Sequence, residues 1–232
     1  MRAPLSVIIP TLNAGACLPA CLGSLGAGLE AGIIRELVIS DGGSSDETCA
    51  IADAAGAALI EGGVGRGKQV AQGVDAAQGA WLLVLHADTV LEDGWAGAVQ
   101  AHMAKGPNRA GYFKLRFDAN GVGAWWVACW ANLRAAIFGL PYGDQGLLVS
   151  AELLQEKGGY PSLPLMEDVA LARALRGHLD ALPAIARTSA GKYETEGWAR
   201  RGAKNLWLLL RYFGGADPAK LAQRYRLSGR SP

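Results

Sequence analysis

Short apolar runs alternate with helical stretches in the first part of the chain. Four runs rich in apolar and β-branched residues predict strands, at residues 5–10, 36–40, 57–61 and 81–85. Three stretches between them predict helices, at residues 16–29, 48–55 and 68–77. Runs that are apolar throughout are typical of parallel strands buried on both faces. The alternation therefore predicts a doubly wound, mostly parallel α/β sheet with right-handed crossovers and flanking helices.

Beyond residue 88 the pattern becomes less regular. Further strands are predicted at residues 111–117 and 146–149, and further helices at residues 95–104, 125–138, 165–175, 198–213 and 218–225. The chain shows no internal repeat and no low-complexity linker, so no second domain is required. We expect residues 1–232 to form a single α/β domain that ends in a helical tail.

Length and composition agree with this expectation. The 232 residues, half of them hydrophobic, are enough for one complete core. The sequence contains no run long and apolar enough to span a membrane, and its first residues lead into a strand pattern instead of a signal peptide, so we expect a cytoplasmic protein. The four cysteines are too few and too scattered for a disulfide framework, and we interpret them as core thiols.

Charge is distributed unevenly along the chain. Residues 198–232 carry eight Lys or Arg and one acid, giving +7, whereas the preceding residues carry −6. Such asymmetry indicates that the tail meets something anionic, but no aromatic-basic platform points to nucleic acid. Two interpretations of residues 198–213 stay open. This basic amphipathic stretch can lie peripherally on an anionic membrane, or its apolar side can pack on the domain.

Acidic residues follow two of the predicted strands. Asp41 comes directly after residues 36–40, and Asp88 comes shortly after residues 81–85. Ligands of open α/β sheets bind outside the carboxyl ends of the strands, so both carboxylates are expected around one crevice. Magnesium and manganese need only one or two carboxylates when a substrate supplies phosphates, which makes Asp88 a candidate metal ligand. The structural alternatives are that Asp41 stabilises a tight turn and that Asp88 caps a helix.

A glycine-rich turn at residues 62–68 resembles a P-loop, G-x-x-x-x-G-K. A P-loop needs Ser or Thr at the next position to bind magnesium, and this chain has Gln69, which argues against an NTPase. Arg66 or Lys68 can face a phosphate, or the segment can be a plain turn.

Two carboxylates, Glu167 and Asp168, open the predicted helix at residues 165–175. The helix dipole favours acids there for structural reasons alone, so a catalytic base is one of two interpretations. No Ser-His-Asp or Cys-His arrangement offers a competing catalytic centre.

Together these segments resemble family 2 glycosyltransferases of the GT-A type. The resemblance covers roughly residues 5–190 and is carried by four ordered motifs: SVIIPTLN at 6–13, VISDGGSSDET at 38–48, HAD at 86–88 and MED at 166–168. Two further segments, GDQG at 143–146 and KYETEGW at 192–198, resemble a small bacterial subgroup. Its members are labelled arsenosugar-biosynthesis or radical-SAM/selenodomain-associated glycosyltransferases.

The resemblance implies an inverting transfer of sugar from a nucleotide-diphosphate donor, for which the family favours UDP over GDP, to an acceptor hydroxyl. Residues 1–110 would then bind the nucleotide and residues 111–197 the acceptor. It implies Asp88 as ligand of a manganese or magnesium ion and Asp168 as general base. The implied donor contacts are Pro10, Thr11, Asn13, Asp41, Gly43, Arg66, Lys68, His86 and Ala87. Asp144, Gln145 and Glu167 are expected on the acceptor side.

One departure from the family pattern concerns the metal motif, which usually reads Asp-x-Asp. Here His86 replaces the first Asp, so one negative charge is missing; the histidine can contact ribose or join the metal shell. Two other functions compete with glycosyl transfer. A nucleotidyltransferase usually has a glycine-rich basic loop directly after its first strand, where this chain has Pro10 to Asn13. A non-catalytic nucleotide-sugar binder is favoured only if Asp168 is buried or ion-paired away from the cleft.

Overall fold

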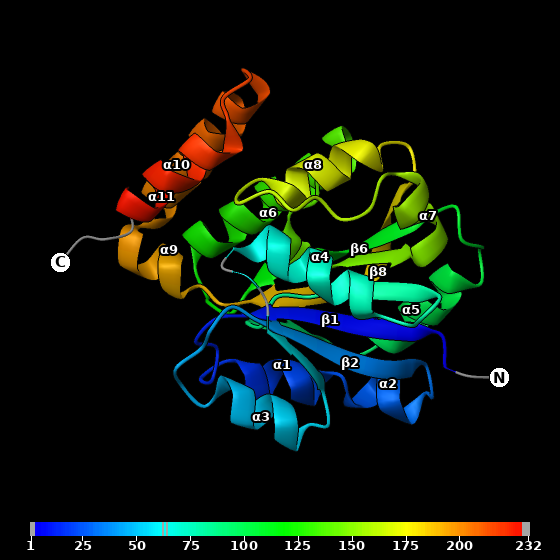
Figure 1. Cartoon of the computed structure of the whole chain (residues 1–232). Coiled ribbons are helices and arrows are strands. Elements are labelled where there is room, and N and C mark those ends of the chain that lie inside the picture. Colours follow the sequence, from blue (N-terminus) through cyan, green and yellow to red (C-terminus); the bar gives the residue numbers. More distant parts are fainter. Residues whose placement is uncertain (1–2, 62, 64, 229–232) are drawn as a thin grey trace.

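An eight-stranded mixed sheet forms the centre of the protein (Figure 1). The structure is a computed structural model, and it describes residues 3–61, 63 and 65–228. The strand order is β3-β2-β1-β4-β7-β6-β8-β5. The strands are β1 (Leu5–Thr11), β2 (Ile34–Asp41), β3 (Ala58–Glu61), β4 (Trp81–Val84), β5 (Thr89–Leu91), β6 (Ala110–Phe117), β7 (Leu147–Ser150) and β8 (Leu179–Thr188).

The sheet has two halves of different character. Strands β3, β2, β1 and β4 are all parallel to their neighbours, as the β–α alternation predicts. Strand β7 is antiparallel to both β4 and β6, and the short β5 is antiparallel to β8. Only β6 and β8 are parallel in this second half. The sheet is therefore more mixed than predicted, because β7 runs antiparallel to both of its neighbours although α6 lies between β6 and β7 in the chain.

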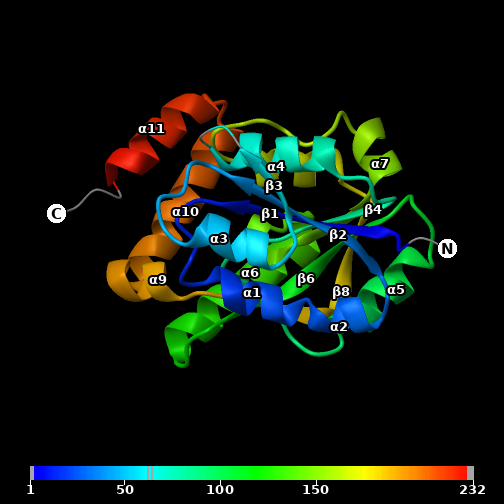
Figure 2. The ribbon, with the colours of Figure 1, turned by 60° about the horizontal axis from the view of Figure 1, so that its bottom comes forward.

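Helices cover both faces of the sheet. They are α1 (Leu18–Ser24), α2 (Gly26–Glu30), α3 (Thr48–Ala54), α4 (Arg66–Ala76), α5 (Trp95–Met103), α6 (Val122–Phe138), α7 (Ala151–Glu156), α8 (Glu167–Ala174), α9 (Gly191–Glu196), α10 (Trp198–Phe213) and α11 (Pro218–Ser228). In Figures 1 and 2, α1, α2 and α3 lie on one side of β1 and β2, and α4, α7 and α8 lie on the other.

The alternation of side chains along β1 explains these two layers. Leu5, Val7 and Ile9 are fully buried in the core cluster that includes α1 and α5. Ile8 points to the opposite face and packs in the cluster formed with α4, α7 and α8. Because successive side chains of a strand point to opposite faces, a continuous apolar run is what a doubly covered strand needs.

Several elements were not predicted from the sequence, namely β5, β8, α7 and α9, and the helix expected at residues 16–29 is divided into α1 and α2. Strand β8 contains Pro183, which cannot donate a ladder hydrogen bond. The pairing of β6 with β8 shifts register between Tyr112 and Lys114, so that Pro183 lies in a bulge. A proline within an apolar run argues against a strand, and this explains the omission.

The C-terminal tail packs on the domain through one of its sides. Leu208 and Leu209 of α10 are buried in a cluster with Val169 and Ala172 of α8. Part of the tail is therefore covered by the domain, which was one of the two interpretations from sequence. Among residues 3–61, 63 and 65–228, none of the helices combines the length and the apolar character that crossing a membrane requires.

Candidate active site

The ends of β1 and β2 are joined by a network around Asp41. Oδ1 of Asp41 accepts hydrogen bonds from the hydroxyls of Thr11, at 2.8 Å, and Ser44. Oδ2 accepts from the backbone N–H groups of Gly43, at 2.9 Å, and Ser44, at 2.7 Å. Burial raises the pKa of Asp41, but these hydrogen bonds outweigh it and lower the pKa, so the side chain stays ionised. The sheet thus holds a fixed negative charge at this edge.

Asn13 links the loops that follow β1 and β2 through further hydrogen bonds. Its side-chain Oδ1 accepts from the backbone N–H of Ser45 at 2.9 Å, and its own N–H donates to Oγ of Ser44 at 2.7 Å. Asn13 adopts a left-handed backbone with φ of 49°, which asparagine tolerates better than most residues. Pro10 lies buried within β1, paired with Ser40. The predicted donor residues after β1 and β2 therefore form one preorganised loop pair.

Gln69, which breaks the P-loop pattern, has a structural role. It is buried in α4, and its Nε2 donates to the backbone carbonyls of Thr11 and of Ser40, the latter at 3.0 Å. Gln69 therefore ties α4 to the ends of β1 and β2, a role that the sequence did not reveal. Positions 62 and 64 of the P-loop-like turn lie outside the described residues.

The segment after β4 brings His86 against Gly143. A Cβ added to Gly143 would lie 2.4 Å from Nε2 of His86, so any larger residue at this position would require the His86 ring to shift. Desolvation and the positive charges of Arg66 and Lys192 lower the pKa of His86 well below its ordinary value, and the ring is therefore neutral. Ala87 packs against the core.

Asp88 and the first turn of α8 supply the expected carboxylates. Asp88 is half-buried, and its side chain forms no hydrogen bond or ion pair with the residues that the structure describes. Asp168 is also half-buried; its Oδ2 accepts from the N–H of Gly143 at 2.9 Å and its Oδ1 from the N–H of Val169 at 2.8 Å. These bonds join the α8 terminus to the segment that contacts His86. Asp168 has no ion pair within the described residues, which removes the condition that favoured a non-catalytic binder.

Glu167 lies beside Asp168 but is buried more deeply. It is 3% exposed, and Nε of Arg66, whose side chain is half exposed, lies 4.0 Å from its Oε1. Burial and the adjacent Asp168 raise the pKa of Glu167 to about 7, although Arg66 opposes this shift. Lys68 is exposed and makes no ion pair with any described residue. Of the two predicted basic residues, Arg66 is the one that the structure brings to the carboxylates.

Asp144 and Gln145, which follow one another in a 3-10 turn (Gly143–Gln145), have different surroundings. Oδ1 of Asp144 is buried without a hydrogen-bond partner among the described residues. Desolvation, together with Asp168 and Asp88, raises the pKa of Asp144 to about 6, against the opposing effect of Arg134. Asp144 therefore belongs to the same group of carboxylates.

The expectation that Gln145 faces an acceptor is wrong. Gln145 is completely buried, and its Nε2 donates to the carbonyl of Phe113 at 3.1 Å. Its Oε1 accepts from the N–H of Tyr142 at 3.4 Å, so the amide serves the packing of the turn against β6.

The carboxylates suit a hard divalent cation in type. The described residues contain no group of three or more side chains that would enclose a metal by themselves. Asp88 and the unpartnered oxygen of Asp144 are oxygen donors of the kind that magnesium and manganese take, and these ions usually complete their coordination with substrate phosphates and water. The residues present therefore fit a cation that is shared with a diphosphate.

The curled mixed sheet, with its parallel first half and its acidic side chains after β2 and β4, defines the GT-A class of glycosyltransferases. A model of the family described as Glycosyl transferase family 2 matches residues 6–139, more than half of the chain. The protein therefore belongs to glycosyltransferase family 2.

Individual relatives agree with this assignment. Over 99 residues the chain is 46% identical to a PGL/p-HBAD biosynthesis glycosyltransferase of Mycobacterium tuberculosis and its counterpart in Mycobacterium bovis. The match covers 39% of this chain and only 38% of the mycobacterial protein.

Solved structures show the same fold. Staphylococcus aureus TarS 1–349 superposes with a TM-score of 0.62 and 20% identity, over 81% of this chain and 60% of that one. Glucosyl-3-phosphoglycerate synthase of Mycobacterium tuberculosis, in complex with Mn²⁺, UDP and phosphoglyceric acid, superposes with a TM-score of 0.56 and 20% identity. This match covers 80% of this chain and 69% of the synthase.

Proposed function

We propose that this enzyme transfers a sugar from a UDP-sugar to an acceptor hydroxyl with inversion at the anomeric carbon. The observation that carries the proposal is the convergence of charged residues from separate segments on the turn at Gly143. This turn contacts His86, is bonded to Asp168 and carries Asp144, whose pKa responds to Asp88 and Asp168. Donor activation and acceptor deprotonation would thus take place at one edge of the sheet.

The donor side would be held by the loops after β1 and β2. The fixed charge of Asp41, with Thr11 beside it, would accept hydrogen bonds from the nucleoside, and Pro10, Asn13 and Gly43 would shape the loops around it. His86 and Ala87 would complete the donor site. The neutral imidazole suits a ribose contact or a place in the metal shell, because it carries no positive charge that would repel a cation.

The reacting end would be served by Arg66, Asp88 and Asp168. Departure of the nucleoside diphosphate develops negative charge, which the guanidinium of Arg66 would stabilise, with exposed Lys68 close by in sequence. Asp88, with Asp144 nearby, would hold a manganese or magnesium ion, and the ion when bound would supply further stabilisation of the diphosphate. Asp168 would take the proton of the acceptor hydroxyl. Glu167 would lie buried beside it in the first turn of α8.

Support for UDP and a divalent cation comes from proteins of the same fold. TarS of Staphylococcus aureus was crystallised with UDP-GlcNAc and with UDP, and the mycobacterial synthase with UDP and either Mn²⁺ or Mg²⁺. We further propose membership of the arsenosugar or radical-SAM/selenodomain-associated subgroup, supported by the segments at 143–146 and 192–198. A cytoplasmic location, with peripheral contact of the basic tail to the inner face of an anionic membrane, completes the proposal.

Two substitutions test the separate roles. Asp168→Asn removes the proton acceptor without adding bulk, so turnover should fall by about 10²–10⁴-fold while UDP binding is retained. Asp88→Ala should instead lose the manganese-dependent part of UDP binding, measured by calorimetry with and without manganese. Asp75→Asn, at an exposed carboxylate of α4, is the matched control and should resemble wild type. An Asp168→Asn enzyme that keeps more than about a tenth of its turnover would contradict the base assignment. Equal UDP affinity of Asp88→Ala and wild type would contradict the metal assignment.

A further inference from the structure

Helix α6 exposes an apolar face along its whole length. The helix has 17 residues, which corresponds to about 25 Å. Its exposed positions are all apolar or weakly polar: Val122, Trp125, Trp126, Cys129, Trp130, Leu133, Ala136, Ile137 and Phe138. The one charged residue of α6, Arg134, is 7% exposed and lies on the opposite, buried side. The usual polarity of a surface helix is thus reversed.

This face is unlike the rest of the surface. Among the described residues, fourteen large hydrophobic side chains are exposed; seven belong to α6 and four to α10. Val122 is 75% exposed, Trp126 is 64% exposed, and Trp125 and Ile137 are each 63% exposed. Hydrophobic residues scattered singly over a surface need no explanation, whereas a concentrated patch indicates an interaction site.

Helix α10 adds apolar and basic side chains beside α6. The two helices pack against each other, and Trp198 of α10 lies against Gly123 of α6. Leu206, Leu210 and Phe213 of α10 are exposed, although Leu208 and Leu209 are buried in the domain.

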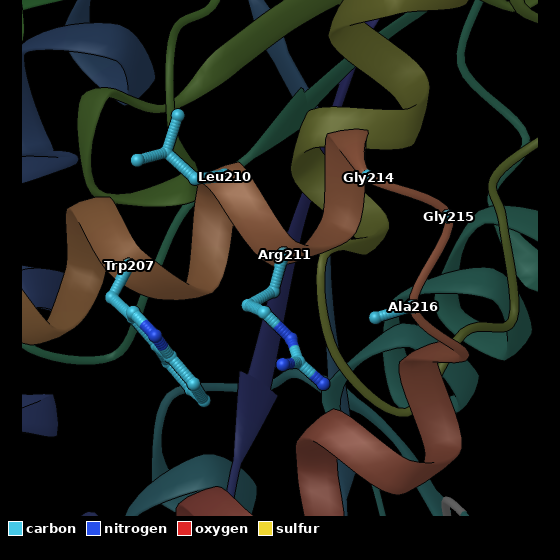
Figure 3. Close-up of a pocket in the computed structure, with 6 residues that line it drawn as sticks. All are labelled: Trp207, Leu210, Arg211, Gly214, Gly215 and Ala216. Atoms are coloured by element: carbon cyan, nitrogen blue, oxygen red, sulfur yellow. The ribbon is translucent and has the colours of Figure 1, made fainter.

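Charged and aromatic side chains accompany these residues on α10. Figure 3 shows Trp207 and Arg211 extending from α10 toward α11, where they help to line a pocket, with Leu210 on the other side of the helix. Arg211 lies over the Trp207 ring at 5.3 Å, and Arg200 is exposed in the first turn of the helix. None of the residues lining this pocket belongs to the proposed donor site.

We propose that α6 and α10 form a membrane-docking surface, in which α6 lies in the interface of an anionic bilayer and the basic tail contacts the lipid headgroups. Charge complementarity decides between a bilayer and a second copy of this chain. Arg201 and Lys204 are ion-paired with Glu196, but Arg200, Arg211, Lys220 and Arg224 are exposed. Anionic lipid neutralises these exposed charges, whereas a second copy brings the same basic side chains to the contact. Three tryptophans on one uncharged helix face suit the boundary between acyl chains and headgroups.

The inference does not depend on the proposed sugar transfer, and it deepens the membrane contact proposed above for the tail. It also extends the tail hypothesis, because α6, which contributes most of the exposed apolar side chains, precedes the basic segment by about sixty residues of sequence. The expected binding has two separable parts. The α6 part is hydrophobic and insensitive to salt, and the α10 part is electrostatic and weakens as salt is added.

Vesicle co-sedimentation of the full chain tests the proposal. Vesicles of phosphatidylcholine with phosphatidylglycerol are compared with phosphatidylcholine alone, at low and high salt. Wild type should bind the anionic vesicles more strongly, and part of this preference should disappear in high salt. The double variant Trp125→Ser/Trp126→Ser should bind at least about 10-fold more weakly at both salt concentrations, because two large aromatic surfaces no longer enter the interface.

Two further variants serve as controls. Leu29→Ser removes a side chain of α2 that is 63% exposed, like those of α6, but lies outside the proposed surface, and it should leave vesicle binding unchanged. Arg200→Gln/Arg211→Gln removes two of the exposed basic side chains, so it should reduce the salt-dependent part of binding and keep the salt-insensitive part. Circular dichroism and thermal melting establish that each variant is folded.

Three results would overturn the proposal. The first is an absence of wild-type binding to anionic vesicles at low salt. The second is equal binding by the folded tryptophan double variant. The third is a wild-type dimer in sedimentation velocity that becomes monomeric in this variant, without vesicle binding by either protein, because α6 would then be a contact between copies. No readout requires sugar transfer, so failure here is distinguishable from failure of the proposed transfer reaction.

Discussion

Replacing Asp41 by alanine removes the acceptor of four hydrogen bonds that hold the loops after β1 and β2 together. The two hydroxyl donors, on Thr11 and Ser44, can rotate toward other acceptors, but the backbone N–H groups of Gly43 and Ser44 cannot. A hydrogen bond to a charged acceptor contributes about 1.5–3 kcal/mol. Gly43 is exposed and Ser44 is half-buried, so water compensates in part and the lower value applies to each. Asp41→Ala should therefore reduce the free energy of unfolding by about 3 kcal/mol.

Asp41→Asn should reduce the free energy of unfolding much less than Asp41→Ala does. An asparagine can direct its carbonyl oxygen to the two backbone N–H groups and its amide to the hydroxyls of Thr11 and Ser44, which are able to accept. The substitution then removes mainly the charge of the acceptor, which should reduce the free energy of unfolding by about 1 kcal/mol. Urea denaturation followed by circular dichroism measures both variants, with Asp75→Ala on exposed α4 as control. An Asp41→Ala protein within about 1 kcal/mol of wild type, which is about a third of the expected loss, would refute the reasoning. So would an Asp41→Asn protein destabilised as much as Asp41→Ala.

The same comparison has a predicted pH dependence. The hydrogen bonds lower the folded-state pKa of Asp41 in spite of burial, so its charged form stabilises the fold above the unfolded-state pKa of about 3.9. This contribution is lost as the pH falls through the lower, folded-state pKa. The stability difference between wild type and Asp41→Asn should be constant above about pH 5 and should shrink in more acidic solution. A difference that grows on acidification would show that Asp41 is not stabilised as a carboxylate.

Three further substitutions probe the surroundings of the site. Gln69→Ser loses both hydrogen bonds to the ends of β1 and β2 and should lower stability by about 2 kcal/mol without creating ATP hydrolysis; phosphate release from ATP would revive the NTPase interpretation. Gly67→Ala would place a Cβ 2.1 Å from the carbonyl oxygen of Leu163, so α4 must move and the thermal midpoint should fall, whereas an unchanged midpoint would contradict this close approach. Because the pKa of Glu167 is raised to about 7, metal-free wild type should lose stability as the pH rises from about 4.3 to that value, and Glu167→Gln should remove this slope. Parallel stability curves of the two proteins in urea would exclude a raised pKa.

Local patterns were sufficient for the first half of the fold. Continuous apolar runs such as that of β1, separated by helical stretches, predicted parallel strands covered on both faces. The structure confirms the parallel pairing for β1 to β4 and the coverage for β1 and β4, whereas β3 at the edge of the sheet is largely exposed. Proximity of the loops carrying Thr11 and Asp41 was predictable for a related reason. Parallel neighbours place their carboxyl ends at the same edge, so the rule needs only strand order and no knowledge of side-chain contacts.

The second half depended on contacts between residues far apart in sequence. Gly143 meets both His86 and Asp168, and nothing in the local periodicity of these three segments indicates that meeting. Gln145 follows Asp144 directly, yet burial against β6 gives the two side chains different roles. Pro183 concealed β8, because only the partner strand β6 shows that the proline lies in a bulge.

Helix α6 shows most clearly what sequence determines and what tertiary structure decides. Its composition determined that it is a helix with almost no polar side, a pattern that by itself is typical of a buried element. Which side remains without a partner depends on where β6, α9 and α10 lie, and these elements left the tryptophan side uncovered. Hydrophobicity is a property of each side chain and is readable from the sequence, whereas burial is a property of the neighbours, and those are assigned only when the whole chain has folded.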